Sequence, residues 1–177
     1  MLKNKYTVIS VGCTIAFGLI LTYLSRDVAP DLAPFYPTPI GVVDKMLEMA
    51  EITADDVVYD LGCGDGRIVI AAASQFGARG VGVEYDPEVA TRAINNVRKS
   101  GVEDLVQIVV GDAMKVDVTP ASVVMLYLLP ESNVKLRPIL ETSLKPGTRV
   151  ISHDWDMAGW TASQIAHIAD GTARIHT

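Results

Sequence analysis

The sequence predicts an α/β fold built on a doubly wound, mostly parallel β-sheet. Three observations predict it. Strand-like and helix-like segments alternate from residue 40 onward, the strand-like segments are short apolar runs of the kind buried in parallel sheets, and a glycine-rich loop joins the first of them to a helix. A length of 177 residues suits one domain of this class.

The expected elements follow one another along the chain. Helices are expected at 40–49, 67–75, 87–99 and 133–144, and strands at 57–61, 80–84, 106–110, 123–128 and 148–152. Residues 173–177 look like a strand that is just beginning. A sheet of this type would normally need another strand or two. The sequence therefore predicts a shortened sheet, either because the chain is a fragment or because it is a shortened member of its class.

The first 26 residues have a different character. Residues 7–24 carry no charge, and a helix of that length spans roughly 27 Å, close to a bilayer core. A membrane anchor at 1–26 is therefore expected. A cleaved signal peptide and a buried core helix are the alternatives, but the run lacks a clean small-residue cleavage site and polar residues at helical spacing. Residues 27–39, with four prolines, are expected to be a semi-rigid linker, and 40–177 the globular domain.

Charge and cysteine content narrow the classes of partner. The net charge is −6, and without residues 1–26, which hold three basic residues and no acid, the remainder carries −9. Such a surface repels phosphate backbones, so no nucleic-acid partner is expected and a basic substrate such as a lysine side chain fits better. Cys13 and Cys63 are too few for a disulfide framework or a cysteine metal site, and His167 and His176 are isolated, so no metal is expected.

The segment Asp60-Leu61-Gly62-Cys63-Gly64-Asp65-Gly66-Arg67 lies between an expected strand and an expected helix. Gly62 and Gly64 permit a tight turn and close approach of a ligand, and the following helix offers free backbone N–H groups. Glu84 ends the next strand, 20 residues past Gly64, where an acid accepts hydrogen bonds from both ribose hydroxyls. The combination predicts a nucleoside-containing cofactor.

Two cofactor classes compete for this loop. The dinucleotide fingerprint is G-x-G-x-x-G, whereas here the third glycine comes early, at Gly66. Asp60 and Asp65 would repel a diphosphate but suit the cationic methionine end of S-adenosylmethionine. Asp112, after the third strand, would accept a hydrogen bond from the adenine amino group, with a plain helix cap as the alternative interpretation.

These residues resemble the first three motifs of class I, or seven-β-strand, S-adenosylmethionine-dependent methyltransferases, over roughly residues 35–160. The resemblance implies a Rossmann-like fold and S-adenosylmethionine as cofactor. The cofactor-binding residues it implies, together with the reading above, are Tyr36, Thr38, Asp60, Gly62, Gly64, Asp65, Gly66, Glu84, Tyr85, Asp112 and Ala113.

The segment after the fourth strand decides the subgroup. It lacks the Asn or Asp followed by Pro-Pro of enzymes that methylate base amino groups in DNA. Residues 34–39, 126–130 and 149–155, with the anchor, resemble the protein-lysine methyltransferases of the mitochondrial FAM173-like group and their prokaryotic relatives. That implies methyl transfer to lysine ε-amines of a protein substrate, sometimes a membrane protein, and implies that Tyr36 and Thr38 fold over the cofactor.

The catalytic residues are not identified by the sequence. Tyr127 and Leu128 are candidates to line a substrate channel that Tyr36 closes, and no general base is assigned. His153 is expected to be a hydrogen-bonded histidine at a strand end, with steering of a cationic substrate, together with Asp154, as the alternative. Trp155 and Trp160 are expected to serve packing or a membrane interface.

Other functions stay open. They are a methyltransferase for a lipophilic small molecule, a non-catalytic cofactor-binding assembly protein and an NAD-dependent oxidoreductase. The positive-inside rule would export the domain, because Lys3 and Lys5 precede the apolar run. A cofactor made in the cytosol argues the opposite, so a membrane-anchored domain on the cytoplasmic side is expected.

Overall fold

The computed structural model describes residues 36–169 and 171–176. The predicted anchor at 1–26 and most of the predicted linker lie outside these residues. Within the described ranges, no helix is long and apolar enough to cross a membrane.

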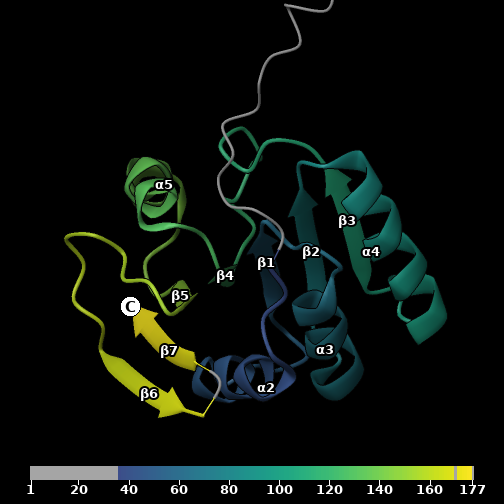
Figure 1. Ribbon diagram of the computed structural model, residues 1–177, viewed down its shortest axis with the longest axis horizontal. Helices are drawn as coiled ribbons and strands as arrows, with labels where there is room; N and C mark the ends of the chain where they lie inside the picture. The colour runs from purple at the N-terminus through teal and green to yellow at the C-terminus, as the bar shows by residue number, and fades with distance from the viewer. Residues whose placement is uncertain (1–35, 170, 177) are drawn as a thin grey trace, which may run out of the picture. The chain divides into compact units, whose positions relative to one another are not determined.

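The described chain is an α/β structure around a seven-stranded sheet. Its elements are α2 (Ile40–Met49), β1 (Val57–Leu61), α3 (Arg67–Phe76), β2 (Arg79–Glu84), α4 (Pro87–Ser100), β3 (Val106–Val110), β4 (Val123–Leu126), α5 (Pro130–Ser143), β5 (Arg149–His153), β6 (Gln164–Ile168) and β7 (Gly171–His176). The strand order is β3-β2-β1-β4-β5-β7-β6. The first five strands are parallel, and β7 runs antiparallel to both β5 and β6. Figure 1 shows β1, β2 and β3 side by side, with their arrowheads at one edge.

Alternation along the strands divides the apolar residues between the two faces of the sheet. Val58, Met125 and Ile151 pack with Val42 and Met46 of α2 in one cluster of buried residues. The neighbouring positions on the strands pack with α5 in a second cluster, which includes Tyr59, Leu61, Val124, Leu126, Val150, Leu136 and Leu140. Because both faces are covered, the parallel strands are short apolar runs, as the sequence predicts.

The end of the fold differs from the prediction. The prediction of a shortened sheet is wrong, because β6 and β7 form an antiparallel hairpin that brings the sheet to seven strands. β6 was missed because it is an edge strand with exposed or half-buried residues throughout, so it carries no apolar run. α5 begins at Pro130, before the predicted start at 133, since proline suits the first helical position.

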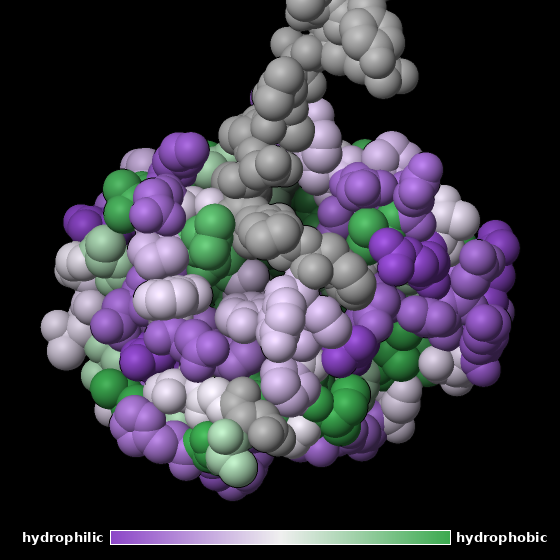
Figure 2. Space-filling model, in the orientation of Figure 1, coloured by the Kyte–Doolittle hydropathy of each residue, from purple (hydrophilic) through white to green (hydrophobic). Residues whose placement is uncertain are grey.

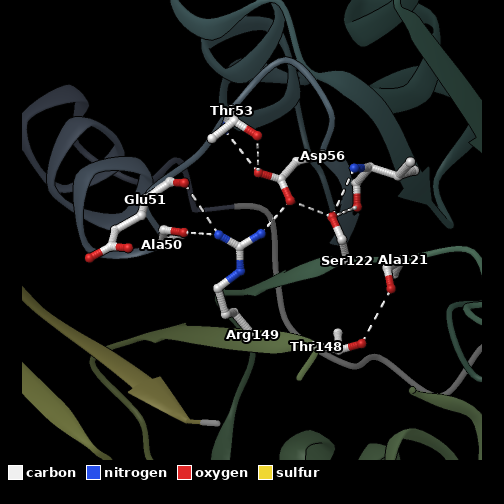
Figure 3. A network of polar contacts seen from close by, with 9 residues as sticks. Ala50, Glu51, Thr53, Asp56, Ala121, Ser122, Thr148 and Arg149 are labelled. Atoms are coloured by element: carbon white, nitrogen blue, oxygen red, sulfur yellow. Dashed lines mark hydrogen bonds and ion pairs between the residues drawn. The ribbon is translucent and has the colours of Figure 1, made fainter. Parts of the chain in front are cut away.

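A polar network holds the edge of the sheet where the parallel strands begin (Figure 3). Asp56, just before β1, is buried and accepts hydrogen bonds from Arg149, from Ser122 Oγ at 2.7 Å and from the Thr53 backbone N–H at 2.8 Å. Arg149 also donates to the carbonyl oxygen of Ala50. These bonds tie the start of β1 to the starts of β4 and β5 and to the end of α2.

The surface in the orientation of Figure 1 is mainly polar. Figure 2 shows hydrophilic residues over most of this face, with hydrophobic residues in small separate patches. Exposed apolar residues that occur singly are normal for a protein surface.

Candidate active site

The glycine-rich loop lies where β1 ends and α3 begins. Gly62, Gly64 and Gly66 have φ values of 90°, 56° and 81°, a region that favours glycine. The N–H groups of Gly62 and Cys63 both donate to the carbonyl oxygen of Val83 at 2.9 Å, which fixes the loop beside β2. A Cβ at Gly62 would approach Leu128 to 2.9 Å. The loop therefore needs glycine both for its conformation and for the room it leaves.

Cys63 points into the protein from this loop. Its side chain is buried, and a Cβ at Gly82 of β2 would meet its Sγ at 2.7 Å. Burial raises the pKa of the Cys63 thiol, and the charges of Asp60 and Glu84 raise it further. Cys63 is thus a packed, protonated thiol.

Glu84, the last residue of β2, is already oriented by the backbone. Its Oε2 accepts the N–H of Gly64 at 2.9 Å, and its Oε1 accepts the N–H of Asp86 at 2.9 Å. A carboxylate has about four acceptor positions, so both oxygens retain capacity for further donors. The same side chain fixes the loop and presents acceptors at the edge where the strands end.

Asp60 is the second buried carboxyl group here. It is 3 % exposed, and among the described residues none donates a hydrogen bond to its carboxylate. Burial raises the pKa of Asp60 to about 8, with Glu84 and Asp65 adding repulsion. A buried acid without a donor is suited to a positively charged ligand group, which would favour its ionised form.

Asp65 pairs with the arginine that begins α3. Its carboxylate pairs with Arg67, Nε to Oδ1 at 2.9 Å and Nη2 to Oδ2 at 2.6 Å. Burial acts to raise the pKa of Asp65, but the hydrogen bonds and charge of Arg67 outweigh it and lower that pKa. Arg67 Nη1 also donates to the Thr38 carbonyl oxygen at 2.8 Å. The pair ties the buried Thr38 segment to the start of α3, and direct contact of Asp65 with the cofactor stays a prediction.

The third acid, Asp112, follows β3. Its Oδ1 accepts the N–H of Met114 at 2.9 Å, which makes it the cap of a turn; no helix of the described chain begins there, so it is not the helix cap of the alternative interpretation. Strand pairing places Val110 beside Glu84, so Asp112 follows β3 at the same edge of the sheet. Ala113 is buried in the second apolar cluster, the one that packs with α5, while Tyr85 is 45 % exposed beside Glu84.

A row of rings crosses the ends of β4 and β5. Tyr36 meets Tyr127 edge to face with ring centroids 6.4 Å apart, and Tyr127 lies against His153 with centroids 3.9 Å apart. Tyr36 is 70 % exposed and Tyr127 is half-buried. Burial raises the pKa of Tyr127, and nearby Asp154 and Tyr36 raise it further. Leu128 is buried against Gly62, so it supports the loop from below.

His153 is not the hydrogen-bonded histidine that the sequence predicts. It is 1 % exposed, yet neither ring nitrogen has a hydrogen-bond partner within the described structure. Nε2 lies 3.4 Å from Asp154 Oδ2. Burial lowers the pKa of His153, which Asp154 opposes and Arg174 reinforces, so the imidazole is neutral near pH 7.

The loop after β5 is fixed on both sides. Arg174 of β7 pairs with Asp156 at 2.8 Å, and Asn133 of α5 donates to the Asp156 carbonyl oxygen. Trp160 packs on the second apolar cluster and donates through Nε1 to Glu141 at 2.8 Å, as expected of a packing residue. Trp155 is 45 % exposed.

Sequence reasoning did not identify Arg67 or the buried state of His153. The Asp65-x-Arg67 spacing was a usable signal for the first, because a loop acid and an arginine two residues later can pair. No local signal marks the second, since the ring contacts join residues from three distant segments.

Comparison with known proteins identifies the family. The model of the ANTKMT methyltransferase domain matches residues 60–164. A protein-lysine N-methyltransferase of Saccharolobus islandicus is 47 % identical over 139 residues, which cover 78 % of this chain and 86 % of that protein. A Xenopus laevis lysine N-methyltransferase, named for an ATP synthase component, is 30 % identical over 169 residues, which cover 92 % of this chain and 74 % of that protein.

A solved methyltransferase structure is similar to this chain in both sequence and fold. An RNA methyltransferase from Salinibacter ruber in complex with S-adenosyl-L-homocysteine is 51 % identical, with a TM-score of 0.79, and the match covers 80 % of this chain and 93 % of that one. These findings confirm the predicted resemblance to the FAM173-like group and the predicted cofactor.

The site fits S-adenosylmethionine. Glu84 has spare acceptor capacity for ribose hydroxyls beside the glycine loop, and Asp60 is a buried acid without a donor among the described residues. When bound, this cofactor supplies a methyl group carried on a sulfonium. The chain belongs to the family of the ANTKMT methyltransferase domain and is a class I S-adenosylmethionine-dependent methyltransferase.

Proposed function

We propose that this enzyme transfers methyl groups to the ε-amines of lysine side chains in a protein. The observation that carries the proposal is the wall formed by Tyr36 and Tyr127 at the edge of the sheet where the cofactor loop lies, beside the half-exposed acid Asp154. The names of the Saccharolobus and Xenopus relatives support the same substrate class.

The chemistry of a lysine acceptor suits this wall. Only the neutral amine has a lone pair for attack on a sulfonium methyl group. Contact with the half-buried Tyr127 ring would remove water from the amine, which disfavours the ammonium form and so lowers the pKa of the arriving lysine. Asp154, near Tyr127, would attract the cationic side chain from solvent. Positioning and desolvation then supply most of the rate acceleration, and no general base is required of the protein.

The remaining candidate site residues have supporting roles in this proposal. Thr38, whose carbonyl oxygen accepts from Arg67, and Tyr36 cover the cofactor, while Gly62, Gly64 and Gly66 receive it. Asp112, Ala113 and Tyr85 surround its adenine end. Leu128 holds the loop in place.

Labelled methyl transfer tests the substrate class. Full-length enzyme is incubated with tritiated-methyl cofactor and a cell extract, which is then divided for protease, ribonuclease and organic extraction. We expect protease-sensitive label that appears as methyllysine after acid hydrolysis. Glu84→Ala should abolish the transfer, whereas Glu88→Ala, an exposed acid of α4, should retain it. Label that organic solvent extracts would support a lipophilic small-molecule acceptor instead.

RNA is the second candidate acceptor. It is favoured by the name of the Salinibacter structure, which is 51 % identical to this chain. Against it stands the charge of −9 outside residues 1–26, which repels a phosphate backbone. Ribonuclease-sensitive label in the same experiment would decide for RNA.

We further infer that residues 1–26 attach the enzyme to a membrane, that 27–39 form a linker and that the catalytic domain lies on the cytoplasmic side, within reach of membrane-protein substrates. The support is the uncharged run at 7–24. The full-length chain should sediment with membranes after alkaline carbonate washing. Ile20→Arg combined with Leu21→Arg should release it, and sedimentation unchanged by both charges would contradict the anchor.

A further inference from the structure

His153 lies between the β6–β7 hairpin and Tyr127, the residue that follows β4. It is the last residue of β5, and its imidazole is buried with both nitrogens lacking hydrogen-bond partners in the described structure. An N–H without an acceptor in the interior destabilises the folded state. An apolar residue would fill the same volume without an unpaired polar group, so the presence of a histidine at this position needs another explanation.

One side of the imidazole is limited by the β6–β7 hairpin. A Cβ added to Gly171, the first residue of β7, would overlap His153 Nε2 and come within 3.3 Å of Val42 Cγ2. The backbone beside it is fixed as well, because Asp154 N donates to the Thr172 carbonyl oxygen at 2.7 Å and Thr172 N donates to Asp154 Oδ1 at 2.9 Å. Asp154 holds a φ of 59°, uncommon for a residue with a side chain. The backbone of β7 therefore leaves no space for the imidazole to move toward it.

The other side of the imidazole supports Tyr127. The ring centroids lie 3.9 Å apart with planes inclined at 36°, a closer contact than that between Tyr127 and Tyr36 at 6.4 Å. Tyr127 lies beyond the last residue of β4, so the strand ladder does not fix it. The described contacts of its ring are with His153 on one side and Tyr36 on the other.

We propose that His153 is a positioning residue for the methyl acceptor, acting through Tyr127, and that Gly171 of the β6–β7 hairpin holds it in place. The hairpin fixes the imidazole, the imidazole fixes the Tyr127 ring, and that ring with Tyr36 forms the wall against which the acceptor amine is placed. Because His153 is buried, it acts on the acceptor only through this contact. The inference rests on the proposed lysine methyltransferase function.

A double-mutant cycle tests the pathway. His153→Ala should lower kcat/KM for a lysine-containing acceptor about tenfold, while the cofactor Kd, measured by calorimetry, stays within about twofold. Tyr127→Ala should lower kcat/KM at least as much, and the double variant should be no worse than Tyr127→Ala alone. Losses that multiply, or a cofactor Kd that rises in step, would overturn the proposal. Asn95→Ala, an exposed side chain of α4, is the control and should leave both quantities unchanged.

A second variant guards against misfolding. His153→Leu fills the volume without an aromatic ring, so it should fold, checked by thermal unfolding, and still show the acceptor defect. Gly171→Ala should reproduce that defect by displacing the imidazole. A folded Gly171→Ala protein with normal kcat/KM would remove the hairpin from the proposal.

An acceptor-independent measurement separates this inference from the proposed function. In spectra of tyrosine-labelled enzyme, the ring signals assigned to Tyr127 through Tyr127→Phe should shift in His153→Ala, because the imidazole ring current is lost. Unchanged signals would contradict the positioning role whatever the substrate is. Shifted signals in an enzyme that labels no lysine would sustain the ring contact and refute the lysine substrate.

Discussion

Strand β1 has a buried aspartate near each of its ends, and the two carboxylates have opposite surroundings. Asp56 accepts hydrogen bonds from Arg149, Ser122 and Thr53, whereas Asp60 has no donor among the described residues and faces Glu84 and Asp65. Burial acts to raise the pKa of Asp56, but these partners lower it overall, while burial and repulsion raise the pKa of Asp60 to about 8. Burial alone therefore does not determine the state of an acid, and its partners do.

We interpret the Asp56 end of β1 as serving the stability of the fold and the Asp60 end, one strand length away, as serving ligand binding. At the Asp56 edge the polar network serves the fold, because it joins the starts of three strands to α2. At the Asp60 edge the charges of Glu84 and Asp65 disfavour ionisation of Asp60, and we expect a cationic ligand group to relieve this repulsion. Sites that bind ligands commonly keep such unfavourable arrangements, which the rest of the fold stabilises.

The largest expected effect on stability comes from removing Asp56, whose carboxylate is fully hydrogen-bonded at the start of β1. Asp56→Ala leaves the Arg149 guanidinium and the Ser122 hydroxyl without their shared acceptor, so the free energy of unfolding should fall by about 3 kcal/mol in urea titrations. The cofactor Kd should stay within about twofold, since the two edges are independent. Asp55→Ala, the exposed neighbour, is the control and should change stability by less than about 0.5 kcal/mol. An equal loss in both variants would contradict the special role of Asp56.

The next effect belongs to the cofactor edge. Glu84→Ala removes the acceptor of the Gly64 N–H and the predicted acceptor of the ribose hydroxyls, so the cofactor Kd should rise by about thirtyfold, corresponding to about 2 kcal/mol. Calorimetry measures it, with Glu88→Ala expected to bind normally. Stronger loss of stability than of binding would show that Glu84 serves mainly the loop.

The pH dependence of stability sharpens the comparison. Between the ordinary aspartate pKa and about 8, folded Asp60 retains a proton that the unfolded chain has lost, so this group makes stability fall as pH rises. Asp56, with its lowered pKa, has the opposite effect and loses its contribution only as the pH falls toward its ordinary pKa and below.

In the cofactor-free wild-type enzyme, the free energy of unfolding should therefore fall by about 1.4 kcal/mol between about pH 6 and about pH 7. Asp60→Asn should abolish this fall. Urea unfolding at the two pH values measures it. Asp55→Asn should keep the wild-type slope. If the wild-type enzyme shows no decline over that interval, Asp60 is already ionised and the proposed electrostatic arrangement is wrong.

The smallest expected effect tests whether Asp112, which caps a turn, also contacts the cofactor. Asp112→Ala should weaken cofactor binding about fivefold, or about 1 kcal/mol, if its carboxylate also accepts from adenine. Asp117 is a close structural control, because its Oδ1 accepts the N–H of Thr119 at 2.9 Å, as Asp112 Oδ1 accepts that of Met114. Asp117→Ala should leave the Kd unchanged. Equal Kd values in the two variants would leave Asp112 as a turn cap only.

The parts of the fold that sequence predicts are those with strong local periodicity. Strands Val57–Leu61 and Val106–Val110 and helix Ile40–Met49 agree with their predicted bounds, since apolar burial dictates each pattern. Strand Gln164–Ile168 was missed because an edge strand needs no apolar run, and it exists through pairing with β7.

The candidate site divides in the same way. Glycines and acids at fixed spacing predict the cofactor loop and Glu84, because the chemistry needs those residues close together in sequence. The Tyr36–Tyr127–His153 row was predicted only in part, since packing between distant segments creates it. Its role stays a prediction.

The packed thiol of Cys63 gives the cofactor loop a built-in reporter. Since Gly82 and the neighbouring acids keep the sulfur buried and protonated, it reacts with alkylating reagents only while the loop is open. In a Cys13→Ser background, the rate of alkylation would measure how often β1 and α3 separate at the loop. Ligands that close the loop would slow that rate, so oxidants should spare this enzyme longest when its cofactor is abundant.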